Sequence, residues 1–130
     1  MVKLIDRIKE AEATLEARLE DEKRQLAEAQ RRLDEDDRQR GREEAAKIVN
    51  TIDAKILVEV DEKKKMLVYP IGRGRTGTMT PFETGFAEYM LDHYTAEGLD
   101  VTIDKTPLNM GIGKGIQAYD FNLRISWLNK

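Results

Sequence analysis

The sequence contains no cysteine and only one histidine, and these absences exclude several kinds of chemistry. Without cysteine there is no disulfide framework and no thiolate-bound metal. Without a second histidine, His-rich metal sites and Cys–His nucleophilic pairs are excluded too. The only serine, Ser126, falls in a regular strand pattern and not in the sharp turn of a nucleophile elbow. We therefore expect no metal, no cofactor and no enzyme activity.

Long apolar runs are also missing. No stretch approaches the roughly 18 apolar residues of a membrane span, and the opening MVKLIDRIKEAE lacks the apolar segment of a signal peptide. The net charge of −3 comes from nearly balanced signs, so it provides no bulk attraction to nucleic acid or to an anionic membrane. These features predict a soluble protein with no membrane partner.

Glycine, proline and aromatic residues are absent from the start of the chain. Residues 2–40 contain neither glycine nor proline, and all eight aromatic residues lie beyond residue 65. Residues 1–65 instead hold 34 of the 47 charged residues. The sequence therefore predicts a charged, extended N-terminal element joined to a small α+β domain, which is near the lower size limit for a self-sufficient core.

Apolar residues near the N-terminus recur with a seven-residue period, which is typical of a coiled coil. These residues occupy two series of positions, each with a seven-residue spacing, and together they are called the seam below. Glu12 interrupts one series and Glu22 interrupts the other. A stripe of two positions in seven is too narrow for a helix lying on a globular core, so it predicts a homodimer or homotrimer. The seam consists of Ile5, Ile8, Leu15, Leu19, Leu26, Ala29 and Leu33.

Two alternatives to the coiled coil remain open at this point. One is a single charged helix held by pairs such as Glu20–Arg24. The other is an intrachain hairpin, since residues 34–43 contain Gly41 and lack the heptad pattern. We read residues 34–43 as a solvated charge run. The predicted organisation is a coiled-coil stalk over 1–42, a connector helix over 43–54 and an α+β domain over 55–130.

The α+β domain is predicted to have a ββαββ order with a mainly antiparallel four-stranded sheet. Strand-like runs occupy 55–60, 65–71, 99–104 and 119–127, although 55–60 is too short to be distinguished from a helix end. Thr80, Pro81 and Glu83 form a capping box at the start of a helix that ends at Gly98. The aromatic face of that helix is expected to be core, with His93 packed at its edge.

Two similar glycine motifs, IGRG at 71–74 and IGKG at 112–115, are candidate anion-binding loops. The stretch GRGRTG matches the glycine pattern of dinucleotide-binding folds, but the helix begins several residues too late and further βα units are missing. Arg73, Arg75 and Lys114 remain candidates for holding phosphate, with Tyr69 and Trp127 as stacking faces for nucleic acid. The simpler interpretation is that both motifs are mobile connections ordered by a partner.

These patterns together predict a non-enzymatic assembly or adaptor protein that binds itself and another protein. The alternative is a phosphate or nucleic-acid binder that uses the basic glycine motifs. In outline, a short stalk with a small domain resembles many small accessory and virion proteins of tailed phages, although no sequence motif supports a particular family. A cytoplasmic or virion-associated location is expected.

Overall fold

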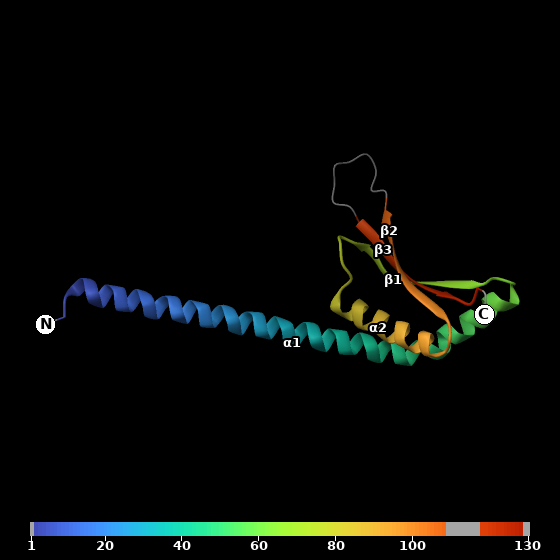
Figure 1. The fold of residues 1–130 in the computed structure, drawn as a ribbon, viewed down its shortest axis with the longest axis horizontal. Helices are drawn as coiled ribbons and strands as arrows, with labels where there is room; N and C mark the ends of the chain where they lie inside the picture. The colour runs from blue at the N-terminus through green and yellow to red at the C-terminus, as the bar shows by residue number, and fades with distance from the viewer. Residues whose placement is uncertain (1, 109–117, 129–130) are drawn as a thin grey trace. The chain divides into compact units, whose positions relative to one another are not determined.

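The computed structural model describes residues 2–108 and 118–128 of the chain, which divides into two compact units, residues 1–34 and 35–130. Below, these are the N-terminal unit and the C-terminal unit. The first helix runs through both units, and three strands and a second helix follow it (Figure 1). The elements are α1 Leu4–Asp61, β1 Met66–Arg75, α2 Pro81–Ala96, β2 Asp100–Leu108 and β3 Ala118–Ser126.

Helix α1 continues through both places where the sequence suggested a break. Gly41 lies within the helix, so residues 34–43 do not form a hairpin, and 43–54 is part of the same helix. The strand predicted at 55–60 is wrong because Ile52 and Ile56 extend the helical spacing of the buried face. Residues 2–108 and 118–128 accordingly form three strands, and the predicted four-stranded sheet is corrected.

The end of α1 explains why its length was underestimated. The amide of Lys64 donates to the carbonyl of Glu59 at 2.9 Å, and that of Lys63 to Val60 at 2.9 Å. This pair of bonds is a Schellman motif, in which the residue after the helix takes a positive φ. Lys63 occupies that position with φ 64°. Because no glycine marks the helix end, the sequence gives no local stop signal there.

The sheet has the order β1–β3–β2, and both outer strands pair with β3 in the antiparallel sense. Strands β1 and β2 are therefore parallel to one another, with β3 inserted between them. Helix α2 connects β1 to β2, which makes a split β-α-β arrangement. The predicted α+β class and antiparallel pairing are confirmed.

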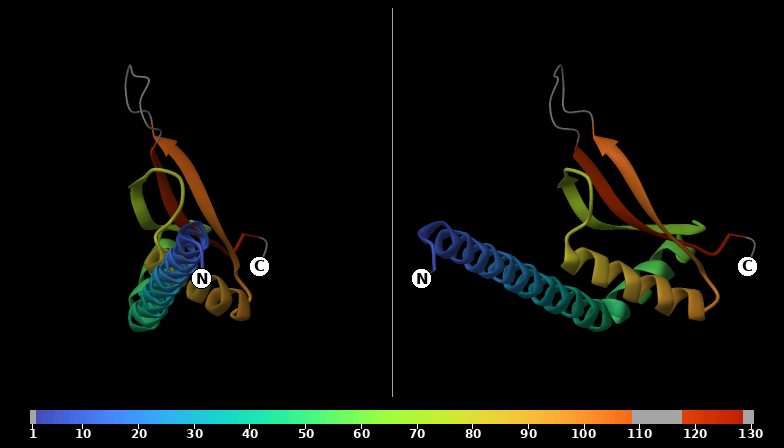
Figure 2. Two further views of the ribbon diagram at one scale, coloured as in Figure 1. Left: turned by 90° about the vertical axis from the view of Figure 1, so that its left-hand side faces the viewer. Right: turned by 60° about the vertical axis from the view of Figure 1, so that its left-hand side comes forward.

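Both α2 and the last part of α1 cover one face of this sheet (Figure 2). The core joins Ala45 and Ile52 of α1 to the aromatic face of α2 and to the alternating apolar residues of β3. The opposite face carries the polar residues of β3, including Arg124, which pairs with Asp104 of β2 at 2.6 Å. One covered face and one wet face agree with the alternation in the sequence. Among the described residues, the largest fully buried side chains are Ile52, Met90, Tyr94, Leu123 and Ile125.

The charged segment 34–43 is not merely a solvated run, because part of it packs against α2. A Cβ placed on Gly41 would lie 2.0 Å from the carbonyl oxygen of Phe82, and one on Gly85 would lie 1.9 Å from that of Arg38. The two helix backbones therefore touch where each carries glycine. Glu88 of α2 reinforces this contact through ion pairs with Arg38 at 3.0 Å and with Arg42 at 2.5 Å.

Both ends of α2 match the sequence prediction. Thr80 accepts from the Glu83 amide at 3.2 Å, while the Glu83 carboxylate accepts from the Thr80 amide at 2.9 Å. At the other end Gly98 has φ 87°, and the Leu99 amide donates to Tyr94 at 3.0 Å. The helix is bounded by local chemistry that the sequence displays directly.

Candidate functional site

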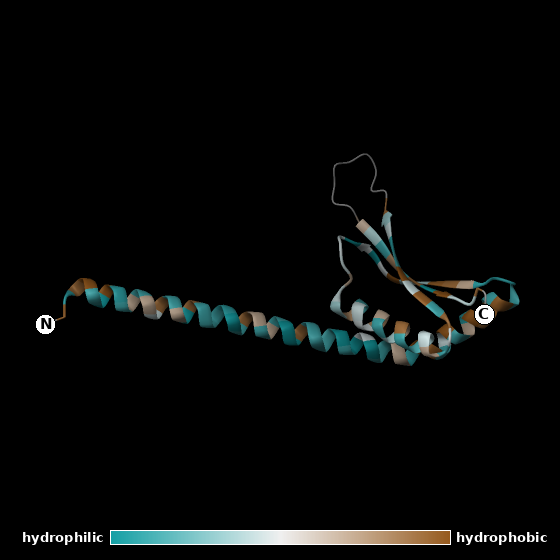
Figure 3. Ribbon diagram, in the orientation of Figure 1, coloured by the Kyte–Doolittle hydropathy of each residue, from teal (hydrophilic) through white to brown (hydrophobic). Residues whose placement is uncertain are grey.

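The most prominent candidate for an interaction surface is the seam on the N-terminal unit. Its large apolar side chains are all exposed, from 43% for Ile8 to 72% for Leu26. Figure 3 shows these apolar bands among hydrophilic residues along the same helix. Burying one leucine fully is worth about 1.5–3 kcal/mol, so a row of this length carries a large unused hydrophobic contribution.

The seam ends where the C-terminal unit begins. The next positions of its two heptad registers after Leu33 are Asp36, Arg40, Glu43 and Lys47, all charged and exposed. The buried positions of α1 in the C-terminal unit, such as Ala45 and Ile52, belong to other registers. One continuous helix therefore carries two separate apolar stripes, and within the described part of the chain only the second is covered.

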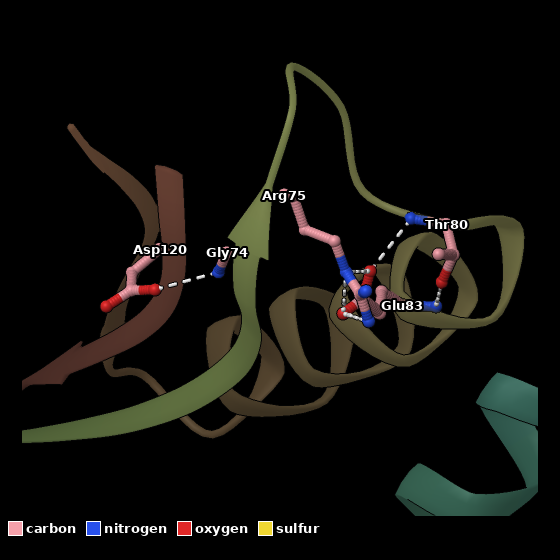
Figure 4. A network of polar contacts seen from close by, with 5 residues as sticks. All are labelled: Gly74, Arg75, Thr80, Glu83 and Asp120. Carbon is pink, nitrogen blue, oxygen red and sulfur yellow. Dashed lines mark hydrogen bonds and ion pairs between the residues drawn. The ribbon is translucent and has the colours of Figure 1, made fainter. Parts of the chain in front are cut away.

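The glycine motif at 71–74 belongs to strand β1 and is not a loop. Two irregularities in the pairing of β1 with β3, between Pro70 and Gly72 and between Gly72 and Arg75, accommodate its glycines. Gly74 has φ 67°, and its amide donates to the Asp120 carboxylate at 3.1 Å (Figure 4). Gly72 is buried against the Glu83 side chain, where a Cβ would lie 2.1 Å from a carboxylate oxygen.

Arg75 and Glu83 form an ion pair at the start of α2. The Arg75 Nε lies 2.9 Å from Glu83 Oε1, and Nη2 lies 2.9 Å from Oε2 (Figure 4). Burial raises the pKa of Glu83, but hydrogen bonds from Arg75 and Thr80 outweigh it and bring the pKa below its usual value. Hydrogen bonding to Glu83 raises the pKa of Arg75. The same carboxylate thus caps α2 and ties it to β1.

This pairing assigns Arg75 a structural role, which differs from the predicted contact with phosphate. Arg73 is exposed on β1, while Lys114 and the IGKG motif lie outside the described residues. The predicted group of three basic residues therefore has one member engaged with Glu83 and one exposed. The dinucleotide pattern has no structural counterpart, because its strand pairs directly with an antiparallel neighbour.

Two further titratable groups on α2, His93 and Tyr94, pack against neighbouring rings and against α1. His93 stacks on Tyr89 with ring centroids 6.0 Å apart and meets Tyr94 edge-on at 4.8 Å, so it is packed as predicted. The Tyr94 hydroxyl donates to Asp53 at 2.7 Å. Burial, then the bond to Asp53, raises the pKa of Tyr94 well above its usual range. No local sequence pattern reveals the contact of Tyr94 with Asp53 or those of Glu88 with α1, because each joins residues more than 40 positions apart.

Two further properties limit the kinds of site present. Within residues 2–108 and 118–128, no group of three or more acidic or histidine side chains is arranged to hold a metal ion. The helices of this described part also include none with both the length and the apolar character needed to cross a membrane. Comparisons with protein families, with curated proteins and with solved structures find no match to this chain.

Proposed function

We propose that this chain is a non-enzymatic assembly or adaptor protein that associates with copies of itself through the seam. The observation that supports the proposal is the exposed heptad row of Ile5 to Leu33, which nothing in its own unit covers among the described residues. A helix with such a row buries it by pairing with other helices. The C-terminal unit keeps its own core and is displayed by the assembly.

The surface that would bind a second protein is supported by fewer features than the seam. Exposed apolar side chains on the C-terminal unit include Leu57 and Val58 at the end of α1 and Met66 and Val68 on β1. Among the described residues, strand β1 is also an edge of the sheet that pairs only with β3. These features support a role as an adaptor that holds a second protein while the seam sets the number of copies.

Replacing two central seam leucines by aspartate tests the self-association. Leu19→Asp combined with Leu26→Asp introduces charges where the seam must be dry, so the protein is expected to become monomeric. The molar mass in solution, measured by sedimentation equilibrium, gives the readout. Far-UV and near-UV circular dichroism of the same sample checks that the C-terminal unit stays folded.

The matched control is Leu57→Asp with Val58→Asp, which makes the same kind of change on the same helix but off the seam. We expect this variant to keep the oligomeric mass of the unaltered protein. An unaltered chain that sediments as a monomer contradicts the proposal. An oligomer that survives the seam substitutions but is lost in the control would place association on the C-terminal unit instead.

A further inference from the structure

The residues beside the seam bear on how two copies would align, and this inference rests on the proposed function. In a two-stranded coiled coil the positions flanking the apolar row face flanking positions of the other helix. On α1 all of these flanking side chains are exposed. One set holds Lys9, Glu16, Lys23 and Gln30, and the other holds Ala11, Arg18, Gln25 and Arg32.

A parallel alignment brings like charges together. Each seam residue would face its own copy, so Glu12 meets the partner's Glu12 and Glu22 meets the partner's Glu22. Arg18 would lie beside the partner's Lys23 on both sides of the pair. Facing carboxylates at a seam are costly because each loses water and lies beside a like charge.

One antiparallel alignment has the same fault. When Leu15 faces the partner's Leu19, Glu12 faces the partner's Glu22 twice. On the flanks, Glu16 then lies beside the partner's Glu16, and Arg18 lies beside the partner's Arg18. Every charged contact in this alignment is repulsive.

The antiparallel alignment shifted by one heptad removes all of these like-charge contacts. Leu15 then faces the partner's Leu26, and Ile8 faces the partner's Leu33. Each interrupting glutamate faces an apolar residue instead of a second carboxylate, with Glu12 opposite the partner's Ala29.

The flanks of this alignment are complementary. Glu16 lies beside the partner's Lys23, and symmetry repeats the pair on the other side. Arg18 lies beside the partner's Gln25, which carries no charge. We infer that the seam is covered by a second copy of this chain in this antiparallel alignment. In this alignment fewer seam residues face an apolar partner than in the parallel alignment. The preference for it therefore comes from the charges and not from the number of leucine contacts.

One charge reversal distinguishes the alignments by the sign of its effect. Lys23→Glu turns both Glu16–Lys23 pairs repulsive, and we expect the dimer to dissociate at roughly tenfold higher concentration. In a parallel pair the same change places glutamate beside the partner's Arg18 and tightens the dimer. Glu16→Lys added to Lys23→Glu restores the pairs and is expected to recover the original dissociation constant, measured by sedimentation.

Distances between spin labels measure the alignment directly. The chain has no cysteine of its own, so Glu10→Cys or Glu20→Cys places one label per copy at an exposed position. In the inferred alignment the two copies of residue 10 are about 32 Å apart along the axis, at 1.5 Å per residue, and those of residue 20 are nearly level. Double electron–electron resonance measures one of these separations in each of the two labelled proteins.

The outcomes separate this inference from the proposed function. A long separation for residue 10 with a short one for residue 20 supports the antiparallel alignment. Short separations for both, tightening by Lys23→Glu, or a trimer in sedimentation overturns it while self-association stands. An axial separation of about 21 Å for residue 10 indicates the other antiparallel alignment and also overturns it. A monomer overturns the proposed function itself.

Discussion

Single glycines fix how closely α1 and α2 approach in the C-terminal unit. Gly41 and Gly85 each face a backbone carbonyl of the other helix, at distances that leave no room for a methyl group. The position of Gly41 in the sequence favoured a helix break, since glycine is a poor helix former. Its true role depends on Gly85, which is 44 positions away, and a local pattern does not reveal such a partner.

Gly85→Ala is therefore expected to destabilise the protein, although alanine is the better helix former. The added methyl group would lie 1.9 Å from the Arg38 carbonyl oxygen, so the helices must move apart. We expect unfolding free energy to fall by about 1–3 kcal/mol in urea titrations. Gly77→Ala is the control, because nothing lies within 4 Å of the added atom there. Equal stability of the two variants would contradict the close crossing.

Glu83 connects a predicted feature with one that the sequence does not show. Its capping of α2 follows from the spacing of Thr80 and Glu83, whereas its ion pair with Arg75 depends on how β1 lies over the helix. Glycine at position 72 leaves the space that the carboxylate occupies. The capping of α2 could thus be predicted from the sequence, whereas the ion pair between Arg75 and Glu83 could not.

Glu83→Gln tests the ion pair through its pH dependence. Because the folded protein lowers the pKa of Glu83 below the ordinary 4.5, the stabilisation is present above that pH and is lost as pH falls through the lowered value. At pH 7 we expect the variant to be less stable by roughly 1–3 kcal/mol. The difference from the unaltered protein should shrink when both are unfolded in urea near pH 3.

Asp104→Asn provides the comparison for this measurement. Its partner Arg124 lies on the wet face of the sheet, where an ion pair contributes about 0–1 kcal/mol. The comparison variant should therefore change stability little at pH 7. A gap between Glu83→Gln and the unaltered protein that persists unchanged at low pH would show that the carboxylate charge is not its source.

At the scale of elements, the sequence predicted those with local boundary signals. Helix α2 has a capping box and a terminal glycine, and β3 alternates clearly, so both were placed correctly. The run at 55–60 contains β-branched residues that suit a strand as well as a helix. It is helical because Ile52 and Ile56 pack into the core, and tertiary packing of this kind is not visible in a short window.

The boundary between the two units predicts where the chain is best shortened. A protein spanning residues 35–130 keeps Arg38, Gly41 and Arg42, whereas one that begins at residue 43 loses all three contacts with α2. We expect the longer piece to match the stability of the monomeric seam variant. The shorter piece should lose about 1–3 kcal/mol.

Urea unfolding followed by the fluorescence of Trp127 measures this difference. Both pieces lack the seam, so both are expected to sediment as monomers, and concentration does not confuse the comparison. Equal stability of the two pieces would show that the crossing of α1 and α2 at Gly41 adds nothing. Failure of the longer piece to fold would contradict the division at residue 34.

At the scale of the whole molecule, two separate apolar stripes lie along one helix. The seam residues make no part of the core of the C-terminal unit, and the core residues of α1 make no part of the seam. The change occurs between Leu33 and Gly41, where charged residues replace the heptad pattern. The sequence showed this change in pattern, but its meaning became clear only with Gly41 placed against α2.

The uninterrupted backbone of α1 makes the N-terminal unit exchangeable. We expect that residues 1–33 can be replaced, in the same helical phase, by a designed zipper of chosen valency while residues 35–130 keep their fold. A library of such chimaeras would display two, three or four copies of one module on demand.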